Sequence, residues 1–294
     1  PNPATSVAIT TDTGISNSDF ITSDDTLDIS GTTEAGAFVL LTDDLNRSVS
    51  TTADSSGAFT LSNAALADGP RALKLTITDT AGNTNAGSIY NVVVDTVKPT
   101  LILSTAAADP TNLNPFTVTA TFAEAVNGLT LGDINVTNGT ASNLTGSGSV
   151  YTFNVIPTAD GKIEVSIGAN AADDTAGNSS VASNTLVRVY DGTAPTVALA
   201  TPATPATKAP FTVTATFSED VTGLVVGDIT TTNGATVGSF TAVSATVYTF
   251  VVTPTAQGQV DEYATTFQGF PVGSATEAEL AGFRQTWAAY DAVL

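Results

Sequence analysis

The chain has 294 residues, of which 28 are acidic and 8 basic, giving a formal net charge of −20, and it contains no His, Cys or Met. These absences exclude Ser-His-Asp and Cys-His nucleophiles, ordinary zinc sites, thiolate-held clusters and disulfides. The acidity predicts repulsion from nucleic acid and anionic membranes, which leaves carboxylate chemistry: hard cations, paired acids or a solvated surface.

The first 97 residues have the pattern of a β-sandwich. Leu73, Leu75 and Ile77 alternate with polar residues. An alternation with period two is typical of a strand that is buried on one face only. Short strands separated by Gly, Asn, Asp and Pro at intervals of about 8–12 residues indicate an antiparallel sandwich. We therefore expect an immunoglobulin-like (Ig-like) domain over residues 1–97.

A second sandwich is expected over residues 98–193. Phe116, Val118, Ala120 and Phe122 alternate with Thr, so apolar side chains would point inward and hydroxyls outward. Seven strands, the number in an Ig-type sandwich, are expected near residues 100–104, 116–122, 130–137, 140–145, 150–156, 162–167 and 184–190.

An internal repeat predicts a third sandwich over residues 194–260. The segment 115–122 recurs at 210–217, 128–134 recurs with two substitutions at 223–229, and Val-Tyr-Thr-Phe recurs at 150–153 and 247–250. After residue 260 the repeat stops, and the last two strands have no recognisable counterpart. No apolar run reaches the roughly 20 residues that cross a bilayer, so we expect no membrane insertion.

Two short motifs carry a resemblance to a known family. Asp-Thr-Ala-Gly-Asn occurs at 79–83 and 174–178, and Asp-x-x-x-Pro occurs at 95–99 and 191–195. With these motifs, residues 1–260 resemble the bacterial Ig-like repeats of large surface adhesins of the biofilm-associated and type I-secreted kind. The resemblance implies an all-β fold of tandem sandwiches joined end to end. It also implies a stalk or spacer role, frequently with calcium at the domain junctions and less often with a ligand-binding tip.

Strand direction predicts which acidic residues face the first junction. The first domain offers five and the second offers three more oxygen-bearing residues: Asp12, Asp24, Asp25, Asp68, Asp95, Asp173, Asp174 and Asn178. Carboxylates packed together repel one another and need a counter-charge, and calcium takes six to eight oxygen ligands. The hypothesis is a calcium-stiffened junction. The alternative is that these Asp residues only form turns and keep the surface solvated.

The second junction is a poorer candidate for calcium. The second domain supplies Asp109, Asn112, Asp160 and Asp191, but the third domain lacks the Asp-x-Ala-Gly-Asn segment and has Lys208 in its first loop. Two further pairs match between the repeats. Asp133 and Asp228 follow Gly and are expected to form turns, whereas Glu124 and Glu219 follow a core strand. No cleft is predicted that would hold an acid pair for glycoside hydrolysis, so we expect no enzyme activity.

The tail, residues 261–294, is predicted to contain a helix. Ser274 to Glu277 match a capping box, and apolar residues follow at spacings of three and four. This stripe, a candidate partner-binding surface, comprises Leu280, Phe283, Trp287, Tyr290 and Leu294. The tail could cover the third sandwich, begin a further domain, or dock onto another copy of the chain.

These features favour a non-catalytic, extracellular spacer segment of a bacterial cell-surface adhesin, with neighbouring Ig-like repeats or other copies of itself as partners. One alternative is a self-assembling filament or sheath subunit that uses the open edge of the third domain and the tail. A second is an accessory module of a secreted polysaccharide-active enzyme. That role would require an exposed row of aromatic residues, yet only 7% of residues are aromatic and most of those in strands fall on predicted core faces.

Overall fold

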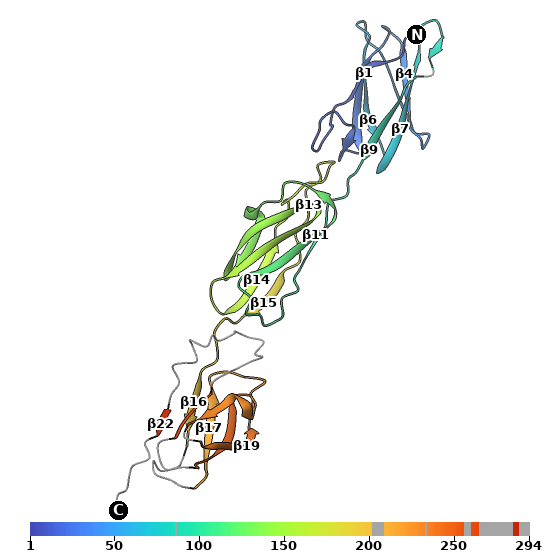
Figure 1. Cartoon of the computed structure of the whole chain (residues 1–294). Helices are drawn as coiled ribbons and strands as arrows, with labels where there is room; N and C mark the ends of the chain where they lie inside the picture. Colours follow the sequence, from blue (N-terminus) through green and yellow to red (C-terminus); the bar gives the residue numbers. More distant parts are fainter. Residues whose placement is uncertain (86, 202–208, 233, 256–259, 265–284, 288–294) are drawn as a thin grey trace, which may run out of the picture. The chain divides into compact units, whose positions relative to one another are not determined.

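The computed structural model describes all residues except 86, 202–208, 233, 256–259, 265–284 and 288–294 (Figure 1). Its regular elements are β-strands and two short 3-10 turns. The chain divides into two compact units. The first comprises Pro1–Ala106, Pro115–Ile156 and Glu164–Val187, and the second comprises Ala107–Asn114, Pro157–Ile163 and Arg188–Leu294. The regular structure of the described residues is therefore all-β, as the sequence predicted.

The first sandwich pairs a three-stranded sheet, β1-β3-β6, with a sheet in the order β2-β9-β7-β4-β5. Its strands are β1 (Thr5–Ile9), β2 (Ile21–Thr22), β3 (Thr26–Thr32), β4 (Phe38–Thr42), β5 (Ser48–Thr52), β6 (Ala58–Ala65), β7 (Gly69–Thr78), β8 (Thr84–Asn85) and β9 (Ile89–Val94). The alternation predicted in β7 is observed: Leu73, Leu75 and Ile77 are buried in the core, together with Leu27 and Leu61 of the facing sheet.

The second sandwich has the sheets β10-β11-β13 and β12-β14-β15. Its elements are β10 (Leu101–Ser104), β11 (Phe116–Val126), the 3-10 turn η1 (Leu131–Asp133), β12 (Ile134–Thr137), β13 (Gly139–Pro157), β14 (Gly161–Ile167) and β15 (Leu186–Tyr190). Two strands predicted at 140–145 and 150–156 are one continuous strand, β13. Asp133 accepts hydrogen bonds from the backbone N–H and the hydroxyl of Thr130, which confirms its turn role.

The third sandwich repeats this arrangement with the sheets β16-β17-β20-β19 and β18-β21-β22. Its elements are β16 (Val197–Ala200), β17 (Phe211–Phe217), η2 (Val226–Asp228), β18 (Ile229–Thr231), β19 (Thr236–Ala242), β20 (Val247–Thr253), β21 (Val260–Ala264) and β22 (Gln285–Trp287). A buried tyrosine hydroxyl fixes the same corner in both repeats: Tyr151 donates to the carbonyl of Val126 at 2.8 Å, and Tyr248 donates to that of Val221 at 2.9 Å.

The structure differs from the sequence prediction at the end of the chain. β21 pairs with β18 as β14 pairs with β12, so the chain does supply strands at the two places for which the repeat gave no counterpart. The predicted helix is wrong at Gln285–Trp287, because these residues form β22 and pair antiparallel with β21. An unpaired strand edge is a strong template for pairing, and this tertiary effect overrides the local helical periodicity. Leu280, Phe283, Tyr290 and Leu294 lie outside the described residues.

Candidate metal centre at the junction of the first two domains

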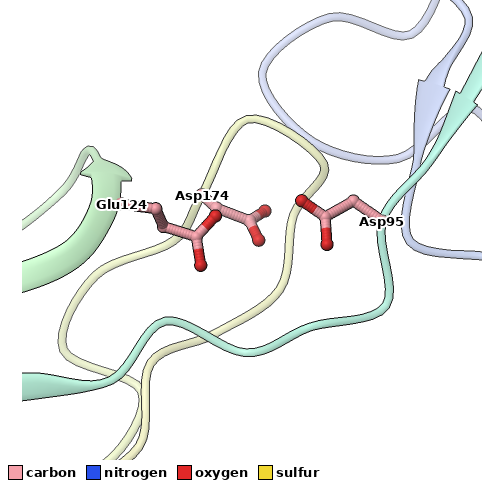
Figure 2. Close-up of side chains that lie close together, drawn as sticks. All are labelled: Asp95, Glu124 and Asp174. Atoms are coloured by element: carbon pink, nitrogen blue, oxygen red, sulfur yellow. The ribbon is translucent and has the colours of Figure 1, made fainter. Parts of the chain in front are cut away.

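Three carboxylates converge where the first domain meets the second. Asp95 follows β9, Glu124 lies near the end of β11, and Asp174 lies within the loop between β14 and β15 (Figure 2). One oxygen atom from each lies within 4.8 Å of the others. All three residues belong to the first compact unit. The first domain therefore supplies one carboxylate to this triad and the second domain supplies two.

The loop of residues 174–178 holds Asp174 in place by its own hydrogen bonds. The backbone N–H of Asn178 donates to Oδ1 of Asp174 at 2.9 Å, and the Asn178 amide donates to Oδ2 at 2.8 Å. The same amide nitrogen lies 2.6 Å from the carbonyl oxygen of Asp95, to which it donates across the junction. Asp174 is only 2% exposed. Its carboxylate is therefore largely removed from water, which raises the cost of leaving its charge uncompensated.

The two domains contact each other closely at Gly14 and Gly177, a contact called here the glycine interlock. The Thr13 hydroxyl donates to the carbonyl of Ala176 at 2.5 Å, so the loop before β2 contacts the 174–178 loop directly. Gly14 has a φ of +92°, and a Cβ atom there would lie 2.1 Å from the carbonyl oxygen of Thr175. A Cβ on Gly177 would lie 2.8 Å from the backbone nitrogen of Gly14. Only glycine permits this approach of the two backbones.

The electrostatics of the triad favour a cation or a proton. Burial raises the pKa of Glu124, and the charges of Asp95 and Asp174 raise it further. Carboxylate oxygens in such proximity are the ligands that hard cations such as calcium prefer. The residues present therefore fit calcium, with Asp95, Glu124 and Asp174 as the residues that would hold it.

Among the described residues, the other carboxylates that the sequence predicted as ligands are not members of this triad. Asp24 accepts hydrogen bonds from Thr11 and Thr26, Asp68 accepts them from Thr96, and Asp173 accepts one from Ser179. Asp25 is exposed.

Asp12 accepts a hydrogen bond from the Phe20 backbone, and its Oδ1 is buried without a partner. Burial opposes ionisation of Asp24, but the hydrogen bonds from Thr11 and Thr26 outweigh it and lower the pKa of this carboxyl.

The sequence prediction named two members of the triad, Asp95 and Asp174, as well as the adjacent Asn178. It missed Glu124 as a ligand, although the match with Glu219 was the signal that marked it.

The second unit contains a related but different group. Burial raises the pKa of Glu219, and the charge and hydrogen bond of Asp191 and the charge of Asp160 raise it further. Asp160 also accepts a hydrogen bond from the backbone N–H of Gly192 at 2.6 Å. Among the residues that the structure describes, no counterpart of the Asp174 loop joins Glu219 and Asp191.

Tandem two-sheet sandwiches with antiparallel pairing and short interdomain connections define an Ig-like architecture. A sequence model described as "Bacterial Ig-like domain" matches residues 1–96, and a second model with the same description matches residues 95–189 and 191–275. The chain therefore belongs to the bacterial Ig-like domain family, as its sequence motifs predicted. A search of curated proteins finds no significant match.

Several solved structures are similar to this chain at low identity. The Escherichia coli adhesin FdeC has 14% identity and a TM-score of 0.47, with 98% of each chain covered. Invasin, a bacterial integrin-binding protein, has 13% identity and a TM-score of 0.40, with 98% of this chain covered. This chain spans 60% of the length of that invasin chain. A 1.5-MDa bacterial ice-binding adhesin has 16% identity and a TM-score of 0.39, with 91% of this chain and 94% of the other covered.

Among the described residues, no helix has the length and apolar character needed to cross a membrane.

Proposed function

We propose that this chain is a non-catalytic, extracellular spacer segment of a bacterial surface adhesin, and that calcium stiffens the junction between its first two domains. Family membership supports the structural role, because bacterial Ig-like domains are built as modules in series. The observation that carries the calcium proposal is the triad of Asp95, Glu124 and Asp174, whose oxygens lie within 4.8 Å of one another.

The triad supports stiffening because the cation would join two domains. Asp95 is four residues before Pro99, where the chain passes from the last strand of one sandwich to the first strand of the next. A cation shared by Asp95 with Glu124 and Asp174 would restrain this connection. Calcium bound to extracellular modules has a dissociation constant of about 10⁻⁴–10⁻³ M, so such a junction would be filled where the calcium concentration exceeds that range.

The second domain also limits movement at the junction without a cation. Thr13 and the glycine interlock connect it to the first domain through uncharged contacts. In this proposal, the uncharged contacts position the two loops against each other, and calcium removes the repulsion among the carboxylates.

The test is the rotational diffusion of the first two domains, measured by NMR relaxation on the full chain in calcium and in EDTA. We expect the two domains to share one correlation time in calcium. In EDTA, where only the uncharged contacts remain, we expect their correlation times to differ. The matched variants are Glu124→Gln, which removes a triad member, and Asp25→Asn, which removes an exposed carboxylate outside it. Independent tumbling in both buffers would refute the stiffening role. An effect of Asp25→Asn equal to that of Glu124→Gln would refute the assignment of the site.

A further inference from the structure

The first domain contains the same loop that forms the junction in the second domain. Both loops read Asp-Thr-Ala-Gly-Asn, at 79–83 and at 174–178. In the first domain, Asp79 accepts hydrogen bonds from the backbone N–H and the amide of Asn83, each at 2.8 Å, as Asp174 does from Asn178. The glycines have φ values of +87° at Gly82 and +90° at Gly177. The two loops therefore have the same conformation.

The surroundings of the two loops differ sharply. Ala176 is 1% exposed because the first domain covers it, whereas Ala81 is exposed. A Cβ atom on Gly177 would meet the backbone of the first domain, but one on Gly82 would have nothing within 4 Å. The loop of the first domain thus presents to solvent the surface that its counterpart buries.

The glutamate of the triad is repeated beside this open loop. In the second domain, Leu101 pairs with Phe122, and Glu124 follows two residues later. In the first domain, Thr5 pairs with Thr32, and Glu34 follows two residues later. The end of the first domain that carries Asp79 therefore has both groups that the second domain contributes to its junction.

The first two residues mark where a connecting segment would run. The terminal nitrogen of Pro1 lies 3.8 Å from Oδ2 of Asp79, and the backbone N–H of Asn2 donates to Glu34 at 2.9 Å. Pro3 stands two residues before Thr5, as Pro99 stands two residues before Leu101. The segment before Pro3 therefore passes both carboxylates, as the segment before Pro99 passes Glu124 and Asp174.

We propose that this end of the first domain is a docking surface for another Ig-like domain whose last strand ends in Asp-x-x-x-Pro and which carries a Thr-Gly loop. The surface, called here the open junction face, consists of Glu34 and residues 79–83. The incoming domain would supply the third carboxylate, in the place of Asp95, and a hydroxyl to the Ala81 carbonyl, in the place of Thr13. This docking does not depend on the calcium proposal, because the hydroxyl and glycine contacts involve no charge.

The test uses a longer chain in which residues 1–98 are followed directly by residues 3–294. This fusion reproduces the connection between the first two domains, with Pro3 in the place of Pro99. The protein has no cysteine, so single cysteines can be introduced without background. The test pair is Ile15→Cys in the added domain and Thr80→Cys on the open junction face. The reference pair in the unextended chain is Ile15→Cys with Thr175→Cys, because the Ile15 nitrogen lies 3.4 Å from the Thr175 carbonyl oxygen.

A matched control pair combines Ile15→Cys in the added domain with Leu45→Cys in the acceptor domain. Leu45 is exposed on the turn near Arg71, at the start of β7, whereas Thr80 follows the end of that strand. With a short bismaleimide, we expect the test pair to cross-link at a rate similar to the reference pair and roughly tenfold or more above the control pair, because docking raises the effective concentration beyond that of a flexible tether. A test pair no faster than the control would overturn the proposal.

Hydrogen exchange provides a second measurement that needs no cysteine. In the fused chain, the amides of residues 80–83 should exchange more slowly than in the unextended chain, and those of residues 43–47 should not change. Unchanged exchange at residues 80–83 in a folded fusion would equally overturn the proposal. Both measurements are made in EDTA as well as in calcium, so failure of the calcium proposal alone leaves the cross-linking and exchange results intact.

Discussion

Replacing Glu124 by Gln should reverse its effect on stability according to whether calcium is present. At pH 7 without a cation, Glu124 is repelled by two carboxylates within 4.8 Å. At that distance each pair of unit charges repels by about 3.5 kcal/mol at an effective dielectric of 20 and by about 0.9 kcal/mol in bulk water. Because Glu124 and Asp95 are only half-buried, solvent screening reduces the repulsion to about 1 kcal/mol per pair.

In EDTA the variant should therefore be more stable than the parent by about 1–2 kcal/mol, which raises the unfolding midpoint of the second domain by about 4–16 °C. In millimolar calcium the order should reverse, because the variant loses a charged ligand. Differential scanning calorimetry in both buffers resolves the domain transitions. The control is Asp25→Asn, which should leave the unfolding midpoint of the second domain unchanged from that of the parent in both buffers. A Glu124→Gln variant that is less stable than the parent in EDTA would refute the electrostatic reasoning.

Three further predictions test separate parts of the structure. Gly177→Ala should destabilise the protein by at least about 1 kcal/mol more than Gly82→Ala in thermal unfolding, because both pay for a left-handed backbone but only the first clashes with the facing domain. Equal costs would argue against the interlock. The raised pKa of Glu219 stabilises the folded state below the unfolded pKa, and this contribution is lost as pH rises through the folded pKa. As the pH is raised from about 4 to 7 in EDTA, the thermal unfolding midpoint of the third domain should therefore fall in the parent relative to the Glu219→Gln variant. The same dependence of the midpoint on pH in both proteins would contradict this prediction. Asp43 is 5% exposed, and hydrogen bonds and the charge of Arg47 outweigh burial and lower its pKa. Asp43→Ala should cost about 2–3 kcal/mol near pH 7 in urea unfolding, and the difference should shrink as pH falls below about 4, through the folded pKa.

The sandwiches were predictable because their signals are local and repeated. Alternation in β7 and β11 indicates which residues are buried, and the repeat of 115–122 at 210–217 predicts the strand β17 of the third domain. The strand β22 was not predictable in this way. Its three residues pair with β21 through a long-range contact, whereas the spacing of apolar residues in the tail favours a helix.

The candidate site was only partly predictable for a related reason. Strand direction brings the end of β9 and the loop after β14 to the same junction, which identified Asp95 and Asp174. It could not distinguish them from Asp24 or Asp68, because those carboxylates accept hydrogen bonds from threonines, which sequence alone does not reveal. Glu124 follows a core strand at a matched repeat position. Its proximity to Asp95 depends on how the two domains approach each other.

Calcium binding by the triad can be measured by isothermal calcium titration of the full chain beside its Glu124→Gln variant. We predict one site per chain that shows saturable heat in the parent, with a dissociation constant of about 10⁻⁴–10⁻³ M, and that is weakened at least roughly tenfold in the variant. Identical titrations of the two proteins, or no saturable heat in the parent, would show that the triad does not bind calcium.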